Sequence, residues 1–279
     1  MKLSAMITFR DPIRLGYPFL EAILSMIPIV DEYLINDGGS KDGTIEILDR
    51  LEEQYPDKII RYNMKDQPGT HWQCVSDQYN KMIEDAEGDW IFQGDADELM
   101  HENSVMRFRK RLEEIKSPDV LALRHLRWEV FNHWSETGWY HYWPARTCRN
   151  VDGIFQSWKS HGGDEFLIGD WDWVRYPPRC IKIYGYLIWH FYVVFPENNL
   201  AKRENDATYI AQGDKGRVEQ YEWYRENYDP KRVPEWYGQK VVYGLPSLML
   251  HHPAKMRYEV DEGLFDKKRL ERLTGLDYT

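Results

Sequence analysis

The sequence predicts an α/β fold with a mostly parallel central sheet flanked by helices. Over the first hundred residues, apolar strand-like runs alternate with helical stripes, and polar turns separate the two. In addition, the apolar run Trp90–Phe92 leads within three residues to a pair of acids, Asp95 and Asp97. Because open α/β sheets bind ligands at the carboxyl ends of their strands, this pattern also predicts where a functional site lies.

The alternation assigns the elements in order. In the first hundred residues, strands are expected at Leu3–Phe9, Val30–Asn36, Ile59–Asn63 and before Asp95, and helices at Pro18–Ile27, Ile45–Tyr55 and Trp72–Ala86, the last with Gly88 as its C′ residue. Further on we expect a basic helix at Ser104–Ile115, strands at Val120–Arg124, Arg127–Phe131 and Ile181–Phe195, a mostly helical segment at Leu200–Tyr228, and a surface helix or arm at Lys255–Leu273. No repeat or linker interrupts the chain, so residues 1–230 are expected to form one domain and residues 231–279 a C-terminal helical extension.

Composition narrows the class of partner and the compartment. The 279 residues carry a formal net charge of -10, which argues against a nucleic-acid partner because nonspecific binding needs Lys and Arg to neutralise phosphates. The three cysteines, Cys74, Cys148 and Cys180, lack metal-ligand spacing and indicate free thiols. The start has no signal-peptide apolar core, and the longest apolar stretch, Tyr184–Phe195, is too short for a transmembrane segment. We therefore expect a soluble, cytoplasmic protein; its oligomeric state is not visible in the sequence.

The acidic pair is the first candidate site. In extended chain, residues two apart point to the same side, so Asp95 and Asp97 are expected to aim at one point beyond the strand. Two carboxylates there suit Mg²⁺ or Mn²⁺, with a substrate diphosphate completing the shell, although an acidic loop alone is the plainer interpretation. A second polar loop, Asn36–Thr44, follows the strand expected at Val30–Asn36. Its Asp37 either accepts hydrogen bonds from a nucleoside or belongs to an ordinary turn.

These motifs resemble family 2 glycosyltransferases with the GT-A fold. Asn36–Thr44 is similar to the Asp-Asp-Gly-Ser-x-Asp-Gly-Thr loop of that family, and Asn80, Gly88 and the Asp95-Ala96-Asp97 stretch follow in its register. Weaker similarity to a subgroup of bacterial sugar transferases extends over Trp143-Pro144-Ala145-Arg146, His161 and Trp189-His190-Phe191.

The resemblance implies a role for each matched residue. Residues 1–100 would bind the nucleotide sugar and residues 101–230 the acceptor. Asp97 would be the direct metal ligand, Asp95 would lie near the ribose and the metal, and His190 would be a third ligand or a diphosphate contact, against the alternative of a core histidine. The remaining expected donor contacts are Thr8, Arg10, Asp37, Gln67 and Asn80, with Asp37 near the base.

Three features depart from the family pattern. Tyr79 stands where the family often has Arg, Asn36 replaces an acid, and no Glu-Asp pair marks the catalytic base. An inverting transferase needs a carboxylate to take the proton from the acceptor hydroxyl. The first candidate is Asp164 and the next is Glu165, in a Gly-Gly loop; the rivals are Asp170 and Asp172, and for each the alternative is a solvated loop acid.

The resulting prediction is a metal-dependent glycosyltransferase that uses Mn²⁺ or Mg²⁺. It would move a sugar from a nucleotide-diphosphate donor, UDP-type favoured through the family, to a carbohydrate or glycoconjugate acceptor hydroxyl with inversion. A non-catalytic nucleotide- or carbohydrate-binding protein on the same fold is the main alternative. A sugar nucleotidyltransferase is disfavoured because Thr8–Pro12 is not a glycine-rich basic loop.

Overall fold

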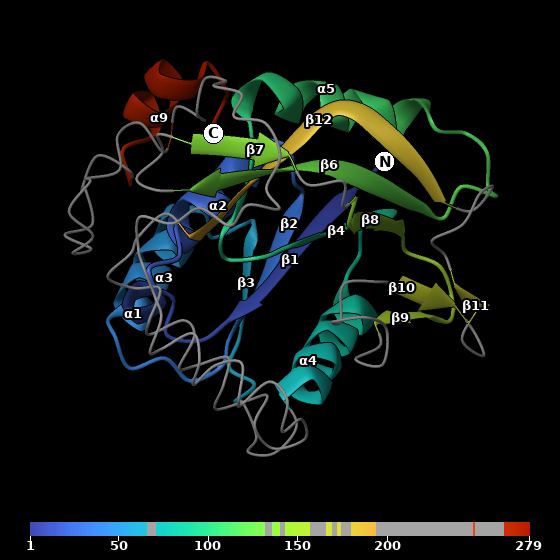
Figure 1. Cartoon of the computed structure of the whole chain (residues 1–279). Helices are drawn as coiled ribbons and strands as arrows, with labels where there is room; N and C mark the ends of the chain where they lie inside the picture. The colour runs from blue at the N-terminus through green and yellow to red at the C-terminus, as the bar shows by residue number, and fades with distance from the viewer. Residues whose placement is uncertain are drawn as a thin grey trace.

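The computed structural model describes residues 1–65, 71–131, 136–139, 143–156, 166–168, 172–173, 180–193, 248 and 265–279 (Figure 1). The segment expected to be helical at 200–228 and the expected domain boundary at residue 230 lie outside these ranges. No helix in the described ranges is both long enough and apolar enough to cross a membrane. Cys74, Cys148 and Cys180 are buried free thiols, as expected from their spacing.

A parallel half-sheet forms from the first hundred residues, as predicted. It contains β1 (Leu3–Phe9), β2 (Glu32–Asp37), β3 (Ile59–Tyr62) and β4 (Trp90–Gly94). β1 pairs in parallel with both β2 and β4, and β2 pairs in parallel with β3. The strand order β3-β2-β1-β4 therefore reverses direction at β1, which is the point where such sheets leave room for a ligand.

The second half of the sheet is mixed. The order continues from β4 through β8 (Ala145–Arg149), β6 (Ala122–Phe131) and β12 (Cys180–Val193) to β5 (Glu98–Met100), with β7 (Glu136–Trp139) paired to β6. The expected break between Arg124 and Arg127 is wrong, because β6 runs through both and pairs with β12 across a register shift. A separate three-stranded sheet joins β9 (Ile154–Gln156), β10 (Phe166–Ile168) and β11 (Asp172–Trp173).

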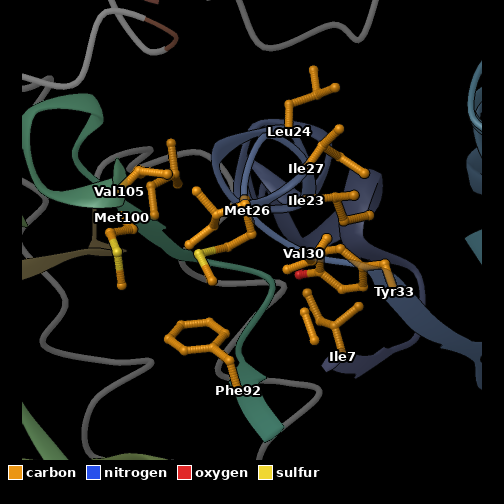
Figure 2. Packing of buried hydrophobic residues seen from close by; sticks show 14 of the residues in the cluster. Ile7, Ile23, Leu24, Met26, Ile27, Val30, Tyr33, Phe92, Met100 and Val105 are labelled. Atoms are coloured by element: carbon orange, nitrogen blue, oxygen red, sulfur yellow. The ribbon is translucent and has the colours of Figure 1, made fainter. Parts of the chain in front are cut away.

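Helices cover both faces of the sheet. One face packs against α2 (Phe19–Met26), α3 (Thr44–Gln54) and α5 (Glu102–Glu114), and a short helix, α1 (Pro12–Leu15), follows β1. Figure 2 shows Ile23 and Met26 of α2 in one apolar cluster with Ile7 and Phe92 of the sheet. The other face packs against α4 (His71–Asp85), so alternate residues of each strand enter different cores.

The C-terminal helix is part of the packed domain. α9 (Lys267–Thr274) was expected within a surface helix or arm, but Leu270 and Tyr278 are fully buried in the larger core. The guanidinium of Arg50 in α3 lies 4.1 Å from the ring centre of Phe265, just before α9. These contacts form because the apolar residues of a strongly amphipathic, charged helix still need a partner surface.

Gly88 has a different role from the expected helix C′ residue. α4 ends at Asp85, three residues earlier. A Cβ atom at position 88 would lie 2.5 Å from the backbone nitrogen of Ser4 and 2.7 Å from the carbonyl oxygen of Trp90. The backbone here approaches β1 so closely that only glycine fits, and the Gly88 N–H donates to Ser4 Oγ at 2.8 Å.

Candidate functional site

The candidate site lies where β1, β2 and β4 end. Thr8, Asn36, Asp37 and Asp95 are the last residues of these parallel strands or follow them directly. Since parallel strands end at the same edge, the side chains predicted from the sequence lie at the edge where the strand order reverses.

The two carboxylate oxygens of Asp37 differ in their contacts: one binds the loop after β2, and the other has no partner among the described residues. Its Oδ2 accepts hydrogen bonds from the backbone N–H groups of Gly39 and Ser40, each at 3.0 Å. Its Oδ1 is buried and has no hydrogen-bond partner among the residues that the structure describes. Because an unsatisfied buried carboxylate oxygen is costly, this atom indicates a place for a donor from a ligand.

The loops after β1 and β2 are fastened together through Asp11. Asp11 Oδ1 accepts from the backbone N–H of Lys41 at 2.8 Å, and the Asp11 N–H donates to Ser40 Oγ at 2.7 Å. Asp11 itself has a positive φ of 49°, which is uncommon for a residue other than glycine. Arg10, a predicted nucleoside contact, is partly exposed on this loop, with its Nε 3.8 Å from Asp11 Oδ2.

A buried amide network explains why position 36 carries Asn. Asn36 Nδ2 donates to Thr8 Oγ1 at 2.9 Å and to the Met64 carbonyl at 3.2 Å, while Oδ1 accepts from the Met64 N–H at 2.8 Å. Thr8 Oγ1 in turn donates to Gln78 Oε1 at 2.7 Å. A carboxylate at position 36 could accept but not donate, so the replacement of the usual acid fits these partners.

The acidic motif is a turn and not extended chain. The Glu98 N–H donates to the Asp95 carbonyl at 3.0 Å, which closes a turn over the intervening residues. The expected alternation that would aim Asp95 and Asp97 to one side is therefore wrong. The two carboxylates instead meet different partners, one from β8 and one from β12.

Asp97 and His190 lie together, and their role as metal ligands stays a prediction. The Asp97 Oδ2 and His190 Nε2 atoms are 3.5 Å apart, and both side chains are largely buried. The pairing of β12 with β5 places His190 opposite Glu98, and the Phe191 N–H donates to the Asp97 carbonyl at 2.8 Å. Backbone hydrogen bonds on both sides thus fix the distance between this carboxylate and this imidazole.

Asp95 belongs to an ion-pair group built on Arg146 of β8. Arg146 Nη2 donates to Asp95 Oδ2 and, at 2.8 Å, to Glu98 Oε1, while its Nε lies 2.8 Å from Glu98 Oε2. Arg127 Nη1 of β6 adds a second contact, 3.4 Å from Glu98 Oε1. The side chain of Arg146 is fully buried, whereas that of Asp95 remains 36% exposed.

Asn80 ties α4 to the small sheet. Its Nδ2 donates to the Gln156 carbonyl at 3.0 Å and its Oδ1 accepts from the Gln156 N–H at 2.7 Å. The Gln156 side chain donates in turn to Gln93 Oε1 in β4. The structure therefore shows Asn80 in a structural contact at the end of β9, and its predicted contact with the donor stays a prediction.

Tyr79, which replaces the family's usual Arg, lies inside the protein. Its hydroxyl donates to the Gly94 carbonyl at 3.0 Å, one residue before the acidic motif. Burial, with the nearby negative charge of Asp95, raises the pKa of Tyr79 well above its ordinary value. The side chain is thus a neutral hydrogen-bond donor that supports the end of β4.

Several predicted residues lie outside the described residues: Gln67, Asp164, Glu165 and Asp170. Asp172 is described only through the backbone of β11. Conversely, the prediction of site residues passed over Arg146 and Glu98. No sequence signal marks Arg146, because β8 reads Ala-Arg-Thr-Cys-Arg and also contains Arg149; only the structure shows which of the two guanidinium groups is buried against the acids.

The side chains present fit a hard divalent cation. Neighbouring ligands of an octahedral Mg²⁺ at about 2.1 Å stand about 3 Å apart, close to the separation of Asp97 Oδ2 and His190 Nε2. Carboxylate oxygen and imidazole nitrogen are both accepted by Mn²⁺ sites. Within the described ranges, no three His, Cys, Asp or Glu side chains gather to hold an ion by themselves, so the pair would need oxygens of a bound diphosphate or water.

The fold and the edge site define an α/β protein of the nucleotide-binding kind, with its ligand edge at the reversal of strand order. Residues 17–163, more than half of the chain, match the family described as glycosyl transferase family 2. The chain belongs to that family, as its motifs indicated, and has the GT-A fold that the resemblance implied. No curated protein matches the sequence.

Solved structures offer more distant comparisons. TarS of S. aureus is 12% identical with a TM-score of 0.45, over 79% of this chain and 41% of that chain. The mannosyltransferase PcManGT from Pyrobaculum calidifontis, solved with GDP-Man and Mn²⁺, is 14% identical with a TM-score of 0.46, over 76% of this chain and 62% of that chain. This chain thus spans less than two thirds of either protein.

Proposed function

We propose that this chain is a metal-dependent glycosyltransferase that moves a sugar from a nucleotide-diphosphate donor to an acceptor hydroxyl with inversion. The acceptor class is a carbohydrate or glycoconjugate, and a UDP-type donor is favoured through the family. The observation that carries the proposal is the juxtaposition of Asp97 and His190, 3.5 Å apart at the ligand edge of the sheet. Family membership supports it independently.

In this proposal, Asp97 and His190 hold Mn²⁺ or Mg²⁺ together with the donor diphosphate. The cation supplies compensation for the negative charge that grows on the leaving diphosphate. Asp95, whose side chain is 36% exposed, would contact the ribose of the donor. The short distance between the carboxylate and the imidazole is set by strand pairing, so the ligand pair is preorganised.

The nucleoside end of the donor would lie against the loop after β2. The Oδ1 of Asp37, which has no partner within the described part of the chain, is suited to accept an N–H or O–H from a base or ribose. Thr8 and Arg10 lie beside this loop at the end of β1. Gln67 would be a further contact with the donor.

The base is proposed to be Asp164, with Glu165 next and Asp170 or Asp172 as rivals. Asp164 and Glu165 fall between β9 and β10, strands tied to β4 and α4 through Gln156. The base would accept the proton of the acceptor hydroxyl as that oxygen attacks the anomeric carbon and the bond to the diphosphate breaks.

The test is nucleotide binding measured by titration calorimetry, with UDP, GDP, ADP and CDP, each in Mn²⁺ and in EDTA. We expect one nucleotide to bind at least ~10-fold more tightly with Mn²⁺, and Asp97→Ala or His190→Ala to abolish that gain. Asp57→Ala, an exposed aspartate after α3, is the control and keeps the gain. Mn²⁺-independent binding in the wild type would refute metal dependence, and no binding of any nucleotide would refute the donor assignment.

Transfer itself is tested with the nucleotide sugar of the base found above and a panel of sugar acceptors. Asp164→Asn is expected to keep donor affinity and lose turnover, and the anomeric configuration of the product, read by NMR, reports inversion. Normal turnover in Asp164→Asn would move the base to Glu165 or Asp172.

A further inference from the structure

Three acids, Asp95, Asp97 and Glu98, stand within four residues at the end of β4. Like charges this close repel one another, and Asp97 and Glu98 are also largely desolvated. The fold compensates with cations from strands distant in sequence, Arg146 from β8 and Arg127 from β6. The acidic motif can therefore keep its shape only if these cations are in place.

Arg146 is the member that touches two of the three acids. One nitrogen, Nη2, donates to both Asp95 Oδ2 and Glu98 Oε1, and Nε faces the second oxygen of Glu98 at 2.8 Å. A guanidinium can do this because its donors form a rigid planar fork, whereas a lysine ammonium is a single point charge. Its side chain has no exposure to solvent, so it cannot be exchanged for water contacts.

The two acids held by Arg146 bracket Asp97. Glu98 begins β5, which pairs with β12 and sets His190 opposite Glu98, and the turn from Asp95 to Glu98 is closed by a backbone hydrogen bond of 3.0 Å. Holding both ends of this turn fixes the direction in which Asp97 leaves it. Through Asp95 and Glu98, Arg146 is thus in a position to set the distance between Asp97 and His190.

We propose that Arg146 is a positioning residue for the acidic motif. From β8, 51 residues beyond Asp95, it fixes the carboxylates of Asp95 and Glu98 and so orients Asp97 toward His190 for binding a divalent cation with a nucleoside diphosphate. This inference rests on the proposed function, because it assigns Arg146 to the same metal site.

A matched control lies on the same strand. The guanidinium of Arg149 donates to the backbone carbonyls of Val120 at 2.8 Å and Ile115 at 2.9 Å, and covers the ring of Trp90 at 4.4 Å. Those contacts hold the scaffold and touch no acid of the motif. Arg149→Lys thus reports what the loss of a structural guanidinium from β8 does to stability and binding.

The experiment compares wild type, Arg146→Lys and Arg149→Lys by thermal melting and by titration with the nucleotide that binds best, in Mn²⁺ and in EDTA. Both variants are expected to melt at lower temperature. Only Arg146→Lys is expected to lose at least ~10-fold of the Mn²⁺-dependent gain in affinity, with binding in EDTA unchanged. Arg146→Gln, which keeps a planar donor but not the charge, is a second variant should the lysine variant not fold.

The outcomes distinguish the proposed function from the positioning role. If the wild type binds the nucleotide equally well in Mn²⁺ and in EDTA, the proposed function is refuted, and this inference with it. A wild type that responds to Mn²⁺, together with an Arg146→Lys protein that is folded and responds equally or more strongly, refutes the positioning role alone. Equal loss of the Mn²⁺ response in Arg149→Lys would also overturn it, because the effect would then come from general loosening of β8.

Discussion

Asn36→Asp tests the buried amide network at the nucleoside end of the site. Asn36 has no exposure to solvent, and its Nδ2 donates to the Met64 carbonyl and to Thr8 Oγ1. The substitution preserves shape but turns this donor into an acceptor. Only the bond from the Met64 N–H, at 2.8 Å, survives unchanged.

The expected cost is about 3 kcal/mol at pH 7. Two lost hydrogen bonds account for about 1 kcal/mol each. The burial of a charged carboxylate beside two oxygen atoms adds a further cost. At pH 7 this further cost cannot exceed about 4 kcal/mol, which is the free energy of protonating a carboxyl whose unfolded pKa is about 4. Met64 limits the damage, since its carbonyl still accepts from Gln78 Nε2 at 3.0 Å.

The loss has a characteristic pH dependence. Burial raises the pKa of the introduced carboxyl above its unfolded value of about 4. A raised folded-state pKa means that the cost of burying the charge is absent at low pH and develops as pH rises through the range between the unfolded and folded pKa values. The difference in unfolding free energy between Asn36→Asp and wild type is therefore expected to be smaller at pH 5 than at pH 7.

Urea unfolding at the two pH values measures both effects, with Asn63→Asp as the control. Asn63 is exposed on the segment after β3, so the same change of charge is expected to shift stability by less than about 0.5 kcal/mol. An Asn36→Asp protein within about 0.5 kcal/mol of wild type at pH 7 would refute the requirement for an amide. A penalty that is the same at pH 5 and pH 7 would show that the buried charge contributes nothing.

Two further predictions concern the scaffold around the site. Gly88→Ala is expected to lower the unfolding free energy by about 3 kcal/mol or more, because its Cβ would stand 2.5 Å from the Ser4 nitrogen and backbone must separate; urea unfolding measures it, and a loss below about 1 kcal/mol would contradict the close approach. Tyr33 and Tyr79 are buried and burial raises the pKa of each, so their contribution to stability is expected to be constant below pH 10 and to fall above it by about 1.4 kcal/mol per pH unit for each. Urea midpoints between pH 8 and 11, compared with Tyr79→Phe, check this slope; an equal slope in that variant would exclude Tyr79.

Local pattern was sufficient for the first hundred residues of the fold. The strand at Leu3–Phe9 has the predicted bounds, β2 and β3 differ from prediction by a residue or two, and β4 ends directly before Asp95 as expected. β1, β2 and β4 are largely buried and are bounded by glycine or polar turns, and the short length of these apolar runs identifies them as strands. Sequence also located Asp37 and the acidic motif at one edge, because parallel strands end together.

Only the tertiary structure determines which residues contact the side chains of the site. The sequence by itself determined which residues occupy the strand ends, but its strand pattern aimed Asp95 and Asp97 at one point and could not assign a partner to either. Pairing of β8 with β4 brings Arg146 to Asp95, and pairing of β12 with β5 brings His190 to Asp97. Side-chain periodicity describes contacts within an element, whereas the position of a guanidinium 51 residues away depends on strand order and register, which only the assembled sheet fixes.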